Sequence, residues 1–179
     1  IEMQTRTEDE TVSDVGEAEK GLVIERRFTS AGSDPFDAFD WIEMNVEIRN
    51  PDGSLAHEIE GARLPSGFAG VAGKVCAQKY LRKAGVPAAL RKVAEDGVPV
   101  WLQRSEPDHE KLQTLDSEDR YVGETDGREL FRRLAGTWTY WGWNYGYFAS
   151  EADARAYYDE MCYLIASQRS APNSPQWFN

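Results

Sequence analysis

Histidine and cysteine, the residues that most often build metal and thiol sites, are scarce in this sequence. It contains two of each among 179 residues, and their spacing matches no metal site. Cys76 and Cys162 each fall within an apolar helical pattern, where a free thiol behaves as a small hydrophobic side chain. We expect both cysteines to be packed in a core, in preference to redox work or a disulfide.

Long apolar runs and an excess of basic charge are also missing. No segment approaches the roughly 20 apolar residues that cross a membrane, and no basic-then-apolar signal segment opens the chain. Acidic residues number 31 against 20 basic ones, which gives a formal net charge of -11. Such a surface repels phosphate backbones. We therefore expect a cytoplasmic protein that binds neither a membrane nor nucleic acid.

The usual motifs of an active site are absent as well. Three glycines at residues 67, 70 and 73 recur at three-residue steps, but they lack the Lys-Ser/Thr ending of a phosphate-binding loop. Adjacent basic pairs are more often solvated or salt-bridged in an acidic chain, and they occur at residues 26–27, 91–92 and 132–133. No carboxylate is paired with a histidine or set in an apolar patch that would raise its pKa. The residues alone assign no catalytic, cofactor-binding or metal-binding position.

Composition divides the chain into a tail and one domain. Residues 1–21 are polar, acidic and almost without large apolar side chains, so they predict a disordered extension. Residues 22–170 carry the apolar patterns of one domain with a core. Within it, residues 41–49 alternate with period two, a strong Asn-Pro-Asp-Gly turn follows, and residues 55–60 run back. This pattern predicts a β-hairpin.

Apolar side chains at three- and four-residue steps predict the helices. They are expected over residues 68–80, over 88–95, from a cap at Thr125 through Trp141, and over 151–170. Ser150 and Asp153 form an acidic capping box at the start of the last helix. Between the second and third helices, residues 101–104 are expected to be extended, and 105–124 to form a charged loop with one helical turn near 110–112.

Seven aromatic rings crowd the segment Trp138–Phe148. Such rings can form a stacking platform for a sugar or a base, or a packing layer that joins two helices. The rings follow helical spacing at first, and no basic residue interleaves with them. We favour packing; a stand-alone binding module that uses this run is the alternative function.

The last nine residues, 171–179, resemble the start of a further structure. Two prolines exclude a helix, and the aromatic residues that follow suit a buried strand. An apolar run without a partner, together with a first residue that is isoleucine and not methionine, predicts a piece of a longer protein.

Several strings in this sequence resemble the amino-terminal region of the adenosylcobalamin-dependent (class II) ribonucleotide reductases. The longest are residues 134–143, which read LAGTWTYWGW, and residues 171–179, which read APNSPQWFN. Shorter strings occur in the family's order at residues 24–29, 47–54, 77–80 and 82–87. The resemblance spans residues 24–179.

The resemblance implies an α+β fold that is mostly α. Residues 22–170 would be the helical amino-terminal domain with its β-hairpin, and 171–179 would begin the first strand of a ten-stranded α/β catalytic barrel. The implied enzyme reduces ribonucleoside diphosphates or triphosphates to deoxyribonucleotides by a radical mechanism. Its implied cofactor is adenosylcobalamin, and its implied partners are the ribonucleotide, an external thiol reductant such as thioredoxin, and a second copy in a homodimer. The radical and reductant cysteines lie outside this sequence, so the chain alone is expected to be inactive.

One functional residue follows from the resemblance. Ser174, between Asn173 and Pro175, matches the serine that contacts substrate at the entrance to the family's barrel. A hydroxyl can donate to and accept from a ribose or phosphate oxygen, and the flanking prolines restrict its direction. The alternative is a turn serine that is bonded only to the backbone.

Overall fold

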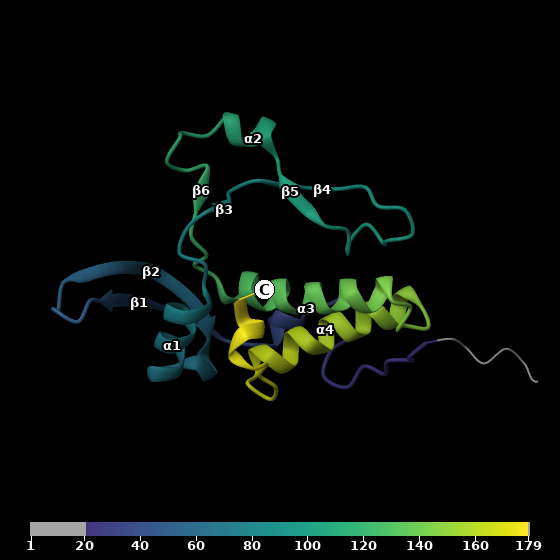
Figure 1. The fold of residues 1–179 in the computed structure, drawn as a ribbon. Helices are drawn as coiled ribbons and strands as arrows, with labels where there is room; N and C mark the ends of the chain where they lie inside the picture. The colour runs from purple at the N-terminus through teal and green to yellow at the C-terminus, as the bar shows by residue number, and fades with distance from the viewer. Residues whose placement is uncertain (1–20, 179) are drawn as a thin grey trace, which may run out of the picture.

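The predicted β-hairpin forms in the computed structural model, which describes residues 21–178 (Figure 1). The elements follow in the order η1 (Pro35–Ala38), β1 (Trp41–Arg49), β2 (Leu55–Pro65), η2 (Ser66–Phe68), α1 (Val71–Tyr80), β3 (Val86–Pro87), β4 (Leu90–Lys92), β5 (Ser105–Pro107), α2 (His109–Gln113), β6 (Tyr121–Val122), α3 (Gly127–Asn144), α4 (Glu151–Ala166) and η3 (Ser174–Phe178). β1 and β2 pair antiparallel. β2 extends beyond the expected strand because Ala62 and Leu64 continue its buried side.

The two longest helices, α3 and α4, pack side by side (Figure 1). The residues expected to line one side of α3 are Leu130, Phe131, Leu134, Ala135, Trp138 and Trp141. The first four are buried and Trp138 packs against the core, whereas Trp141 is exposed, so the prediction was wrong at that residue. The capping box of α4 is also confirmed, because the Ser150 side chain accepts a hydrogen bond from the backbone N–H of Asp153. The cap of α3 is Asp126 and not Thr125, because the Asp126 carboxylate accepts from the backbone N–H of Arg128.

The core lies where the hairpin, α1 and the α3–α4 pair meet. It includes side chains from every one of these elements, among them Val46, Leu64, Phe131, Ile165 and the distant Trp177. Both cysteines are buried and free, as predicted.

Helix α1 turns a face of small residues to the hairpin. Gly73, Cys76 and Ala77 are its buried residues, while Val71 and Val75 are exposed. The expected inward stripe included Val71, Ala72 and Val75, and it was wrong at all three, because each is exposed. A Cβ at Gly73 would collide with the Phe68 carbonyl oxygen and the Met44 side chain, so close packing selects the glycine face.

Residues 82–124 form an arch over α3, built of α2 and β3 to β6 (Figure 1). The helix expected over residues 88–95 is wrong: β4 pairs antiparallel with β5, and β3 pairs with β6. The segment expected to be extended at 101–104 is a turn, whereas the helical turn near 110–112 is confirmed as α2. An ion pair between Arg91 and Glu106 and two hydrogen bonds from Lys92 Nζ to the backbone oxygens of Trp101 and Gln103 stabilise the strand pairing against local helix propensity.

The chain end also differs from the expectation. Residues 174–178 form the 3-10 turn η3, so the expected barrel strand is wrong for the residues that the structure describes. Pro175 fits the first turn of a helical segment, where its missing N–H has no intrahelical partner to lose. The fold is thus mixed α+β without a barrel in residues 21–178. The extension expected over residues 1–21 lies outside the described range except for Gly21.

Candidate functional site

A buried tryptophan anchors the terminal turn η3 to the domain. The indole of Trp177 is 7% exposed and stacks on Tyr80 with ring centroids 4.8 Å apart. Its Nε1 donates to the backbone oxygen of Pro172 at 2.9 Å, which closes the turn on itself. Phe178 lies edge-on to the same tyrosine ring, with centroids 5.6 Å apart. The turn is therefore held from one side by aromatic packing.

Ser174 is the first residue of this anchored turn. It is exposed, and its hydroxyl makes no hydrogen bond to any residue between 21 and 178. The turn's own backbone bond runs from the N–H of Gln176 to the oxygen of Asn173 at 3.0 Å. The hydroxyl is thus available to a ligand, on a segment whose direction is fixed by Pro175 and Trp177.

Behind the turn, a buried ion pair joins Arg133 of α3 to Glu124 at the end of the arch. Arg133 Nε donates to Glu124 Oε1 at 3.1 Å and Nη2 donates to Oε2 at 3.0 Å, which is a two-point contact. The side chains are 13% and 4% exposed. The guanidinium also donates to the backbone oxygens of Tyr80, at 3.3 Å, and Trp177, at 3.5 Å. Glu124 Oε2 accepts from the backbone N–H of Arg82 at 2.9 Å.

A cleft of about 1630 Å³ separates the arch from α3 and α4. Its basic side chains are Arg82, Lys92, Arg104, Arg132, Arg133 and Arg155. Four of them form ion pairs with acids, namely Arg104 with Glu95, Arg132 with Asp34, Arg133 with Glu124 and Arg155 with Asp159. The prediction that adjacent basic pairs are salt-bridged is confirmed at residues 26, 91, 132 and 133. These pairs leave little of the cleft's positive charge for a phosphate.

The aromatic run divides between packing and exposure. Tyr140 donates its hydroxyl to Glu95 Oε2 at 2.6 Å, and Trp143 Nε1 donates to the oxygen of Gly97 at 2.7 Å, so both rings hold the arch to α3. Trp138 packs against the core. Three other rings are exposed, at Trp141, Tyr145 and Tyr147. Packing explains the first set; a stacking role for the exposed set stays a prediction.

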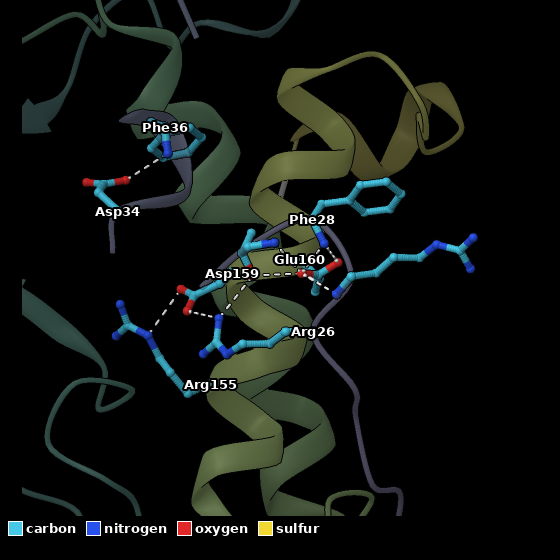
Figure 2. Close-up of polar contacts among 9 residues, drawn as sticks. Arg26, Phe28, Asp34, Phe36, Arg155, Asp159 and Glu160 are labelled. Carbon is cyan, nitrogen blue, oxygen red and sulfur yellow. Dashed lines mark hydrogen bonds and ion pairs between the residues drawn. The ribbon is translucent and has the colours of Figure 1, made fainter. Parts of the chain in front are cut away.

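The sequence did not predict the two buried carboxylates of α4. Figure 2 shows Asp159 and Glu160 side by side on α4, each facing the segment of residues 26–29. Asp159 contacts Arg26 at 2.8 Å and Arg155 at 3.1 Å. Glu160 accepts from the backbone N–H groups of residues 27, 28 and 29 and from the Thr29 hydroxyl. The signal available in the sequence was the presence of acidic residues at positions that the helical pattern turns inward. The contacts of Asp159 and Glu160 anchor the loop of residues 26–29, and they bring no reactive group to these carboxylates.

One further carboxylate departs from expectation. Burial raises the pKa of Glu129, which lines the cleft, although no such carboxylate was foreseen. The nearby acids Glu124 and Asp126 act in the same direction, while backbone hydrogen bonds at Asp126 and Thr125 oppose it.

Comparison with known proteins places these features in a family. A family model described as "Class II vitamin B12-dependent ribonucleotide reductase" matches residues 42–168. The chain belongs to this family. It is 51% identical over 156 residues to the vitamin B12-dependent ribonucleotide reductases of Bradyrhizobium diazoefficiens and Agrobacterium fabrum. It is 31% identical over 166 residues to the one of Streptomyces avermitilis.

The reductase relatives are much longer than this chain. The aligned regions cover 87% of the chain but 12% of each of the first two relatives, and 92% of the chain but 14% of the Streptomyces avermitilis relative. The chain corresponds to the amino-terminal region of such a reductase. Over the described residues no helix is long and apolar enough to cross a bilayer.

The residues that the structure describes do not fit a cobalt site. Imidazole and thiolate are strong protein ligands of first-row transition metals. Neither His57 nor His109 lines the cleft, and burial raises the pKa of the Cys76 and Cys162 thiols to about 12, which disfavours thiolates. Within residues 21–178, no three His, Cys, Asp or Glu side chains gather as a metal site. The structure thus gives no residue between 21 and 178 a role in holding the corrin cofactor.

Proposed function

We propose that this chain serves ribonucleotide reduction by presenting Ser174 to the substrate of its parent reductase. The observation that carries the proposal is an exposed hydroxyl, without a hydrogen bond to residues 21–178, on a turn that Trp177 anchors in the core. Because the turn is already ordered by stacking and by Pro175, a contact through Ser174 costs little further entropy. The resemblance of the Asn-Ser-Pro string to the substrate-contacting string of the family supports the same role.

The hydroxyl can act on a ribonucleotide in two ways. It can donate to a phosphate or ribose oxygen, and it can accept from a ribose hydroxyl. Either contact orients the nucleotide and moves no proton of the reaction. The guanidinium of Arg133 lies behind the turn, and the Glu124 carboxylate balances its positive charge. This pair therefore adds no net charge beside the Ser174 hydroxyl.

The remaining parts of the activity are proposed for the parent enzyme as a whole. They are a ribonucleoside diphosphate or triphosphate substrate, adenosylcobalamin as the source of a radical, a thiol reductant such as thioredoxin, a homodimeric state and a cytoplasmic location. None of them is assigned to a described residue. The chain alone is expected to be inactive.

A chimera tests the proposal. The Bradyrhizobium diazoefficiens reductase, with its matching region replaced by this chain, is expected to reduce ribonucleotides when adenosylcobalamin and a dithiol are supplied. Loss of one hydrogen bond of about 0.5–1.5 kcal/mol in Ser174→Ala should lower kcat/KM by about 2- to 12-fold. Ser170→Ala is the matched control, because Ser170 is exposed and its side chain has no hydrogen bond within the described range. An inactive chimera, or equal kcat/KM for the two variants, would overturn the proposal.

A further inference from the structure

We propose that Arg133 is the positioning residue of the Ser174 turn, with Glu124 holding its guanidinium in place. This inference rests on the proposed function, since it concerns how the substrate-contacting hydroxyl is held. Arg133 does not touch the hydroxyl. It acts through the backbone oxygen of Trp177, which lies in the same five-residue turn as Ser174.

The geometry joins four parts of the chain at one guanidinium. Arg133 lies on α3, its carboxylate partner Glu124 ends the arch, and among its acceptors are the backbone oxygens of Tyr80 of α1 and Trp177 of η3. Tyr80 and Trp177 are also the pair whose rings stack. Arg133 therefore fixes the backbones of the same two residues whose side chains hold the turn. A tilt of the turn would break both the stacking of Trp177 on Tyr80 and the hydrogen bond from Arg133 to the Trp177 backbone.

The chemistry requires an arginine at this position. A planar guanidinium offers five donors in a rigid fork, so it can contact a carboxylate at two points and still donate to carbonyl oxygens. Glu124 is itself fixed by the backbone N–H of Arg82, and it keeps the fork from rotating. A lysine keeps the charge but has three donors on a single nitrogen, so it cannot make both carboxylate contacts and reach both backbone oxygens.

The same residue lies at the boundary between two features of the fold. Arg133 and Glu124 line the cleft beneath the arch, and they also contact the segment that carries Ser174. The arch returns to α3 at Glu124, whose backbone N–H donates to the oxygen of Arg82 at 2.7 Å. One ion pair therefore contributes to the placement of both the arch and the turn.

A double-mutant cycle in the chimeric reductase tests the inference. The variants are Arg133→Lys, Ser174→Ala and the double variant, with Arg132→Lys as control. Arg132 is the neighbouring arginine on α3, and it pairs with Asp34 away from the turn. Arg133→Lys should raise KM for the ribonucleotide by about 2- to 12-fold with little change in kcat, because a misplaced hydroxyl loses its hydrogen bond. Adding it to Ser174→Ala should change kcat/KM by less than twofold, because the hydroxyl it positions is already gone.

The outcomes that would contradict the inference can be told apart. Full multiplication of the two effects in the double variant, or an Arg133→Lys enzyme that matches Arg132→Lys, would overturn the positioning role while leaving the substrate contact standing. A Ser174→Ala enzyme equal to wild type would overturn the proposed function and this inference together. Where Arg133→Lys lowers the folded fraction, as measured by thermal melting, Glu124→Gln takes its place in the cycle. It removes the carboxylate charge and keeps the shape, and the same non-additivity with Ser174→Ala is required.

Discussion

Replacing Glu160 with glutamine should release the loop of residues 26–29 from α4. Glu160 is 8% exposed, and its carboxylate accepts three backbone N–H groups and the Thr29 hydroxyl at distances from 2.7 to 3.2 Å (Figure 2). Four of the five hydrogen bonds go to Oε1, whose place the glutamine oxygen can take, so the substitution mainly removes the negative charge of the acceptor. Its NH₂ group would replace Oε2 and would face the backbone N–H of Phe28.

The magnitude follows from the charge that the acceptor loses. A hydrogen bond contributes about 1.5–3 kcal/mol when one partner is charged and about 0.5–1.5 kcal/mol when neither is, and bonds that share one acceptor oxygen are less than additive. We expect Glu160→Gln to lower the free energy of unfolding of the 179-residue chain by about 2–4 kcal/mol. This loss corresponds to a Tm lower by about 4–16 °C. Glu118→Gln is the control, because Glu118 is exposed and has no hydrogen bond within residues 21–178; its change should stay within about 0.5 kcal/mol.

The pH dependence gives a second readout of the same substitution. Burial alone would raise the pKa of Glu160, but hydrogen bonds from the Thr29 hydroxyl and from the loop's backbone N–H groups outweigh it, so the pKa is lowered below its ordinary value of 4.5. A lowered folded-state pKa means that the stabilisation is complete above pH 4.5 and is lost as the pH falls through the lower folded value. The stability gap between wild type and Glu160→Gln should therefore shrink below pH 4.5. Urea unfolding that shows no gap at pH 7, or a gap that grows on acidification, would refute the reasoning.

Three further outcomes are expected. Trp177→Ala should lower the free energy of unfolding by about 3 kcal/mol and speed amide exchange over residues 172–178, and unchanged exchange there would contradict the anchor. Cys76 and Cys162 should resist a thiol reagent at pH 8 until urea unfolds the chain, because burial raises the pKa of both thiols to about 12; labelling of the native chain would show this to be wrong. Tyr140→Phe should remove a contact of about 1–2 kcal/mol between α3 and the arch, seen as faster amide exchange over residues 88–107 and not in α4.

The parts of the fold that the sequence predicted are those where local pattern and tertiary contact agree. Alternation over residues 41–49 and helical spacing after residue 126 were sufficient because those faces are buried as their patterns require. The failures are non-local. Residues 88–95 have helix formers, yet they pair with a segment that follows Trp101, and no local pattern encodes that partner. At α1, the close approach of Gly73 to the hairpin decides which face of the helix is buried, and Val71 and Val75 are left exposed.

The candidate site was predictable only in part, for a similar reason. Ser174 came from the resemblance and not from physical chemistry, since an exposed serine after an asparagine has no distinctive pattern. Arg133 and Glu124 are nine residues apart, and their common contact with Trp177 arises only when α3, the arch and the terminal turn come together. The Asp159–Glu160 pair was visible as two acids within an apolar helical stretch, but its partners in the loop of residues 26–29 lie more than 120 residues earlier in the chain.

The most direct measurement of the central claim is a crystal structure of the active chimera with a bound ribonucleotide. Our account predicts the Ser174 hydroxyl oxygen within about 3 Å of a ribose or phosphate oxygen, at hydrogen-bond distance. It also predicts η3 still anchored by Trp177 against Tyr80 and held by Arg133. A ribonucleotide whose nearest oxygen lies more than about 5 Å from that hydroxyl, beyond any direct hydrogen bond, would contradict it.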